Sequence, residues 1–186
     1  MSENVFRLRI AGIGGQGVVH LATTISRAAA DSGVPVSVID RPRSAMRLGP
    51  ITCDVIFRQD AFAPFIVPGE ADAVLGLEPL DGIMNAAYEL KPDGLLVLNR
   101  QETPTIEEVV SGQADPRRTQ WLEQLRSRGA RVVAAACPDS AASLNYYLFG
   151  RLMAVCPDFP VSAEAIRQVL KEQEKNCRSF QAGLES

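Results

Sequence analysis

The chain has 186 residues, which is the length of one globular domain. Hydrophobic residues make up 46% of it and charged residues 22%, as is typical of a folded protein with a real core. The net charge is -3 and the basic clusters are short, which argues against a nucleic-acid-binding protein. No apolar run is long enough to cross a bilayer, and the first residues do not read as a signal peptide, so we expect a cytoplasmic protein.

The first third of the chain predicts a βαβ unit. Apolar residues alternate with arginines over Phe6–Ile10, which indicates a strand. A helix is expected to begin after Gly17 and to end before Gly33, and a second strand covers Val34–Ile39. Such a unit implies a right-handed crossover between parallel strands.

Strands and helices keep alternating after this unit. Further strands are expected over Ile51–Phe57, Val74–Leu77, Leu95–Leu98 and Val132–Ala135. The polar residues that alternate along the first of these predict one covered face and one wetter face. Helices are expected over Pro79–Leu90, around Trp121 up to Gly129, over Ser140–Val155 and from Ser162 to about Asn176. The sequence therefore predicts an α/β fold, a Rossmann-like three-layer sandwich with a mostly parallel sheet and a helical C-terminal segment.

A glycine-rich loop lies directly between the first strand and the first helix. Its key members are Gly12, Gly14, Gly15, Gln16 and Gly17. Glycines allow close approach of the backbone, and a helix N-terminus presents free N–H groups and partial positive charge. The position is therefore suited to a phosphate or a carboxylate.

This loop leaves three interpretations open. It satisfies the pattern G-x-G-x-x-G, and Asp40 lies near the place of the ribose-binding acid in dinucleotide folds, so an NAD(P)- or FAD-dependent dehydrogenase is one candidate. Binding of another phosphate, or contact with a partner, is the second. The third is that the glycines only let the helix pack closely on the sheet.

The four cysteines do not form a metal-binding pattern. Structural zinc and iron–sulfur sites need closely spaced thiolates. No C-x-x-C pair is present, so we expect no metal in this chain and four free thiols, at Cys53, Cys137, Cys156 and Cys177.

The order of several motifs resembles the gamma-type subunit of the 2-oxoacid:ferredoxin oxidoreductases, and the resemblance extends over nearly the whole chain. It covers the glycine loop, an arginine loop before the third strand, a segment similar to the family's P-x-x-E-A-D and L-E-P stretch, and one similar to its L-x-P-G-G stretch. In this sequence these are Ala11–Val18, Arg47–Pro50, Pro68–Leu80 and Leu90–Asn99.

The resemblance implies a reaction and a division of labour. A 2-oxoacid and coenzyme A would give an acyl-CoA, CO2 and two electrons for ferredoxin. Thiamine diphosphate, Mg²⁺ and the iron–sulfur clusters would belong to larger partner subunits. Residues 1–186 would form a single gamma-like domain, not catalytic alone, similar to the small subunit of indolepyruvate-type enzymes. A free-standing dehydrogenase and a pure assembly module remain the alternatives.

The resemblance also suggests which residues face coenzyme A or a partner. Besides the glycine loop these are Arg47, Gly49, Glu78 and Asn99, and no catalytic residue is expected. Arg47 could pair with a phosphate of coenzyme A or with a partner's carboxylate. Glu78 could instead cap the helix that starts at Pro79.

The arginine loop departs from the family pattern, because Met46 and Leu48 stand where the family has a glutamine and a glycine. Leucine tolerates positive φ poorly, so this turn is expected to differ. The histidine His20 is expected to be a surface or packing residue.

Overall fold

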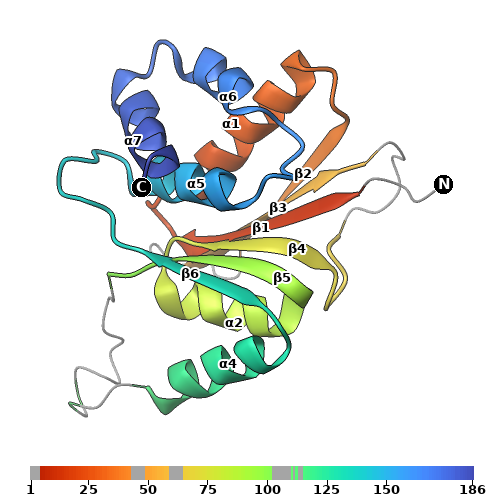
Figure 1. Cartoon of the computed structure of the whole chain (residues 1–186), viewed down its shortest axis with the longest axis vertical. Coiled ribbons are helices and arrows are strands. Elements are labelled where there is room, and N and C mark those ends of the chain that lie inside the picture. Colours follow the sequence, from red (N-terminus) through yellow and green to blue (C-terminus); the bar gives the residue numbers. More distant parts are fainter. Residues whose placement is uncertain (1–4, 43–48, 59–64, 102–109, 111, 113–114) are drawn as a thin grey trace.

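A central sheet, described here from a computed structural model, organises the chain (Figure 1). The structure describes residues 5–42, 49–58, 65–101, 110, 112 and 115–186. Within these ranges six strands form one sheet in the order β2-β3-β1-β4-β5-β6. Their bounds are Phe6–Ile13 for β1, Val36–Pro42 for β2, Pro50–Phe57 for β3, Ala71–Gly76 for β4, Leu90–Asn99 for β5 and Arg131–Ala135 for β6.

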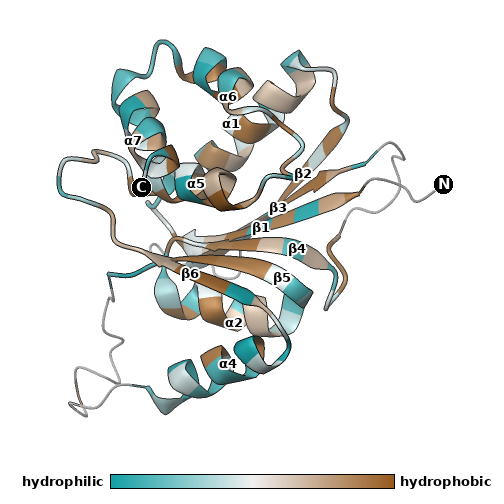
Figure 2. Cartoon of the chain, in the orientation of Figure 1, coloured by the Kyte–Doolittle hydropathy of each residue, from teal (hydrophilic) through white to brown (hydrophobic). Residues whose placement is uncertain are grey.

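Helices cover both faces of the sheet, which gives the predicted three layers (Figure 1). One face carries α1 (Val18–Asp31), α5 (Leu144–Val155), α6 (Ala163–Leu170) and α7 (Glu174–Leu184). The other carries α2 (Pro79–Glu89) and α4 (Pro116–Ser127). The strands are the most apolar part of the chain, as Figure 2 shows. No helix in the described ranges has the length and apolar character needed to span a membrane.

The first two strands are parallel to each other, as the βαβ prediction expects, but they are not neighbours in the sheet. β3 lies between β1 and β2 and is antiparallel to both. The β1–α1–β2 unit therefore skips one strand position, which β3 fills. β1, β4, β5 and β6 are parallel neighbours, so the prediction of a mostly parallel sheet is confirmed.

The polar face of β3 is also not wet, contrary to the sequence-based expectation. Asp54 is 0% exposed and lies opposite Arg9 of β1, which is 1% exposed. Their side chains form a bidentate ion pair, with Nε–Oδ1 at 2.7 Å and Nη2–Oδ2 at 2.9 Å. Two parallel N–H···O bonds in a dry site make a strong, directional contact, which ties β3 to β1 at one register.

Two further charges complete this buried network. Arg9 also pairs with Glu89 at the end of α2, and Nε of Arg41 on β2 lies 3.4 Å from Asp54 Oδ2. Burial acts to lower the pKa of Arg9, but its bonds to Asp54 and Glu89 outweigh this and raise it. The network therefore joins β2, β3, β1 and α2, with Arg9 at its centre.

Removing one partner of this pair should be costly. We expect Arg9→Met to lower the free energy of unfolding by roughly 3–5 kcal/mol, because Asp54 loses its bidentate partner in a buried site and keeps only the longer contact with Arg41. Arg7→Met is the matched control, since Arg7 pairs with Glu70 at the surface, and it should cost less than about 1 kcal/mol. Urea unfolding measures both, and equal effects of the two variants would contradict the assignment.

The C-terminal segment holds two helices after α5, where the sequence predicted one. The predicted N-cap Ser162 is confirmed, because its Oγ accepts from the Ala165 amide at 3.2 Å. The helix ends at Leu170, and α7 begins at Glu174. α7 packs against α5 with the two backbones in close contact. A Cβ added at Gly150 would lie 2.2 Å from Phe180 O, and one at Gly183 would lie 2.0 Å from Tyr147 O.

The sign of the change in stability caused by Gly183→Ala tests whether α5 and α7 cross in this way. Helix propensity alone predicts that alanine stabilises the helix by about 1 kcal/mol. The close backbone contact predicts the opposite, a loss of about 3 kcal/mol from overpacking. Thermal or urea unfolding decides between them, and a stabilised variant would show that α5 and α7 do not cross in this way.

Candidate functional site at the carboxyl edge of the sheet

The predicted site residues that the structure describes gather at the carboxyl ends of the parallel strands. The glycine loop follows β1, Glu78 follows β4 and Asn99 ends β5. The ends lie side by side, because Gly76 pairs with Ala11 of β1 and with Leu98 of β5. This is the edge at which open α/β sheets gather ligands. Arg47, with Met46 and Leu48, lies outside the described residues.

Gln16 closes the glycine loop on itself. Its side-chain Oε1 accepts from the Ile13 amide at 3.0 Å, and its own amide donates to Ile13 O at 3.1 Å. Gly12 makes room for this, since a Cβ there would lie 2.7 Å from Gln16 Oε1. The Gly14 amide donates to Gly49 O at 3.0 Å, which ties the loop to the residue before β3.

Gly17 and Asn145 fix the other end of the loop. Gly17 is the N-cap of α1 with φ of 78°, a left-handed conformation that favours glycine. Asn145 Nδ2 on α5 donates to Gly17 O at 3.2 Å, and a Cβ at Gly17 would lie 2.6 Å from that nitrogen. Substitution at Gly17 is therefore opposed both by φ and by contact. Gly15, with φ of 98°, has no described atom within 4 Å of a Cβ built on it.

This geometry argues against the dinucleotide interpretation of the glycine loop. The amides of Ile13, Gly14 and Gln16 all donate inside the protein. A phosphate cradle needs such donors turned towards the ligand. Asp40 lies within β2. Because β3 separates β2 from β1, Asp40 lies two strand positions from β1, about 10 Å at about 4.8 Å per strand, and not in the strand next to β1.

Glu78 and Asn99 are held by local hydrogen bonds. Glu78 is 9% exposed, and its Oε2 accepts from the Asp81 amide at 2.7 Å, so it caps α2 as the alternative interpretation expected. Asn99 is 7% exposed, and its Oδ1 accepts from the Gln101 amide at 3.1 Å. Both side chains shape the turns at this edge.

A hydrogen-bond chain beside the loop includes His20, which is exposed, as the expectation of a surface or packing residue allows; nothing in the sequence indicated the hydrogen bonds themselves. Tyr146 OH lies 2.9 Å from His20 Nδ1 and 2.7 Å from Thr24 Oγ1. Thr24 gives its one hydroxyl proton to His20 O at 3.1 Å. Tyr146 must then donate to Thr24 and accept from His20, which puts the proton on Nδ1. Burial raises the pKa of Tyr146 despite its bond to Thr24, so it stays neutral.

Three of the four cysteines are not activated as nucleophiles. Burial, with Asp40 and Asp54 nearby, raises the pKa of Cys53 to about 12. Burial also raises the pKa of Cys137 and Cys156. A thiol with a raised pKa is mostly protonated at neutral pH and reacts slowly. Within the described ranges no three His, Cys, Asp or Glu side chains are grouped to hold a metal ion.

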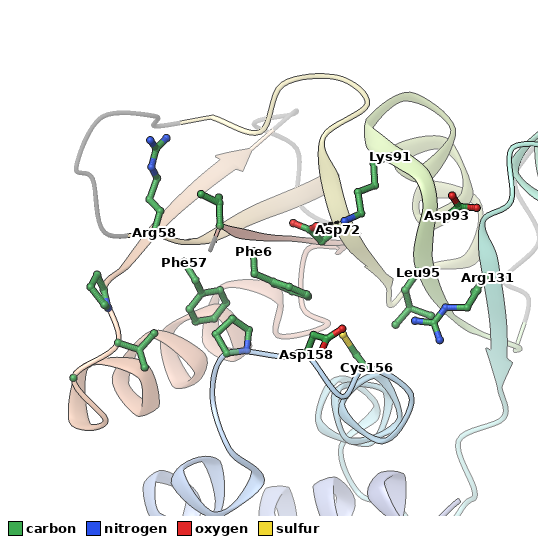
Figure 3. A pocket seen from close by; sticks show the side chains of 15 residues that line it. Phe6, Phe57, Arg58, Asp72, Lys91, Asp93, Leu95, Arg131, Cys156 and Asp158 are labelled. Carbon is green, nitrogen blue, oxygen red and sulfur yellow. Dashed lines mark hydrogen bonds and ion pairs between the residues drawn. The ribbon is translucent and has the colours of Figure 1, made fainter. Parts of the chain in front are cut away.

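A groove of about 830 Å³ lies at the opposite edge, at the amino ends of the strands (Figure 3). Phe6 and Phe57 form its apolar floor, with ring centroids 6.2 Å apart. Acidic and basic side chains alternate on its walls, and Asp72 pairs with Lys91 there. The walls therefore favour neither an anionic nor a cationic ligand.

The comparisons with known proteins agree with the fold. Residues 7–186 match the family described as pyruvate ferredoxin/flavodoxin oxidoreductase. The indolepyruvate oxidoreductase subunit IorB of Thermococcus kodakarensis is 27% identical, and the alignment covers 97% of this chain and 95% of the relative. The subunit of the same name from Pyrococcus horikoshii is 26% identical over the same shares.

Solved structures share the fold. Pyruvate oxidoreductase subunit PORC of Thermotoga maritima superposes with a TM-score of 0.69 at 19% identity, covering 98% of this chain and 96% of that one. The 2-oxoglutarate:ferredoxin oxidoreductase of Magnetococcus marinus gives a TM-score of 0.72 at 16% identity, covering 97% of this chain but 30% of that longer one. The family match spans almost the entire sequence, and the chain therefore belongs to the pyruvate ferredoxin/flavodoxin oxidoreductase family, as a small subunit of a 2-oxoacid:ferredoxin oxidoreductase.

Proposed function

We propose that this chain is the small, gamma-like subunit of a thiamine-dependent 2-oxoacid:acceptor oxidoreductase of the indolepyruvate type. The complex would convert an aryl 2-oxoacid and coenzyme A to an acyl-CoA and CO2 and pass two electrons to ferredoxin. The whole chain would serve as one domain, in the cytoplasm, against a larger subunit that holds thiamine diphosphate, Mg²⁺ and the iron–sulfur clusters.

The observation that carries this proposal is the agreement in length as well as sequence with small subunits of that name. The IorB relatives from Thermococcus and Pyrococcus are each matched over 95% of their own length. The Magnetococcus enzyme supports the need for a larger partner, because there the same fold takes up only 30% of a longer chain.

The chemistry of this chain's side chains supports the same division of labour. The described residues offer neither a cysteine set for a cluster nor grouped carboxylates for Mg²⁺. What they offer at the carboxyl edge is a rigid loop and capped turns. We assign to this edge, together with Arg47, the contact with the coenzyme A side of the larger subunit.

A dehydrogenase that works alone is the weaker candidate. Three amides of its supposed phosphate loop are already satisfied inside the protein, and Asp40 lies two strand positions from β1. A pure assembly module would bind the same larger subunit but would not change the KM of the complex for coenzyme A.

Co-expression with the larger chain tests the proposal. We expect the two chains to purify together and to turn over indolepyruvate with coenzyme A and an electron acceptor, while this chain alone does neither. Calorimetry on the isolated chain should detect no NAD(P) or FAD binding. Turnover or tight nicotinamide binding by the isolated chain would overturn the proposal. If the two chains assemble but this chain has no effect on the KM for coenzyme A, the chain is a pure assembly module.

A further inference from the structure

We propose that Gln16 is a positioning residue, whose carboxamide sets the glycine loop and, through it, the start of β3 for contact with the larger subunit. The inference rests on the proposed function for its partner, but the geometry of the loop carries it independently. No substrate or cofactor atom needs to touch Gln16 for this role.

The carboxamide has one orientation in this loop. The Ile13 amide can only donate, so the Gln16 atom 3.0 Å away must be the oxygen and not the nitrogen. The return bond from the Gln16 amide to Ile13 O, at 3.1 Å, closes a ring of four residues. At the end of β1 the Gln16 side chain therefore accepts the hydrogen bond from the Ile13 amide that a neighbouring strand would otherwise accept.

The ring fixes the direction of the next amide. Ile13 is the last residue of β1 and pairs with Pro50, and the Gly14 amide then reaches Gly49 O at 3.0 Å. This bond extends the β1–β3 ladder by one position beyond the strand. If Gln16 released Ile13, Gly14 would lose its fixed direction, and Gly49 would lose the donor that holds it.

The neighbouring residues allow little adjustment. On one side Gly12 has no room for a side chain, because Gln16 Oε1, Val18 and Leu77 all lie within 3.2 Å of a Cβ built there. On the other side Asn145 holds Gly17 O. Between these two anchors, Gln16 is the side chain that decides the shape of the loop, so its loss should move the start of β3 and not the core.

Three variants separate this role from general loss of structure. Gln16→Met keeps the length of the side chain and removes the acceptor. Gln16→Glu keeps an acceptor for Ile13, and its charge is tolerated at a helix N-terminus. Gln124→Met is the matched control, because Gln124 is exposed on α4, which covers the other face of the sheet from α1.

Amide hydrogen exchange on the isolated chain tests the loop geometry. In Gln16→Met the Ile13 and Gly14 amides should exchange roughly tenfold faster than in the wild type, the effect of losing about one hydrogen bond. In Gln16→Glu they should stay protected. Unchanged exchange in Gln16→Met would overturn the proposed ring.

Assembly and steady-state kinetics of the two-chain complex test the role itself. We expect Gln16→Met to lower either the affinity for the larger chain or kcat/KM for coenzyme A by about tenfold. Gln16→Glu should restore the wild-type value, and Gln124→Met should leave it unchanged. Wild-type values in Gln16→Met despite fast exchange would refute the positioning role, as would failure of Gln16→Glu to restore them. If the wild-type chain does not assemble with the larger chain, the proposed function is wrong. The hydrogen-exchange result on the isolated chain would still test the geometry of the loop.

Discussion

The ion pair between Arg9 and Asp54 is the interaction on which the unusual part of this sheet depends. A bidentate pair at 0–1% exposure has no water to replace a lost partner, so each side chain requires the other. The pair lies where antiparallel β3 meets β1. It therefore fixes the strand that separates this fold from a simple dinucleotide-binding βαβ arrangement, in which β2 would lie next to β1.

That insertion has consequences at the carboxyl edge. With β3 beside β1, the Gly14 amide finds Gly49 O and is no longer available to a ligand. The same sheet order moves Asp40 away from the loop. A glycine pattern that in another sheet would bind a pyrophosphate here forms a closed loop, which suits the partner-contacting surface that we propose.

Most of the layers and elements could be predicted from periodicity, because buried strands and amphipathic helices leave a direct mark on the sequence. The strand order could not. Arg9 and Asp54 read as the polar half of two alternating strands, and nothing in either strand alone shows that the other neutralises it. The split between α6 and α7 was missed because the residues between them, Lys171, Glu172 and Gln173, include no glycine or proline that would mark the end of a helix.

The sequence predicted where the candidate site residues lie in the fold, but not which groups their side chains bond to. Glycines at a strand–helix junction, and polar residues after buried strands, were sufficient to locate Glu78 and Asn99 at the carboxyl edge. The sequence pattern could not tell whether the side chains of Glu78 and Asn99 face a ligand or accept hydrogen bonds from nearby backbone amides, because that depends on distances of about 3 Å. The bond from Gln16 to Ile13 and the chain from His20 through Tyr146 to Thr24 have no sequence signature beyond the residue types.

Hydrogen exchange mapped on the chain alone and in the assembled complex would show whether the larger subunit binds at the glycine loop. We expect the Ile13 and Gly14 amides to be protected in both states, and Gly15 and the first turn of α1 to gain protection when the larger subunit binds. If the glycine loop is unchanged by assembly and protection appears instead along the groove over Phe6 and Phe57, the partner binds at the amino edge and the account is wrong.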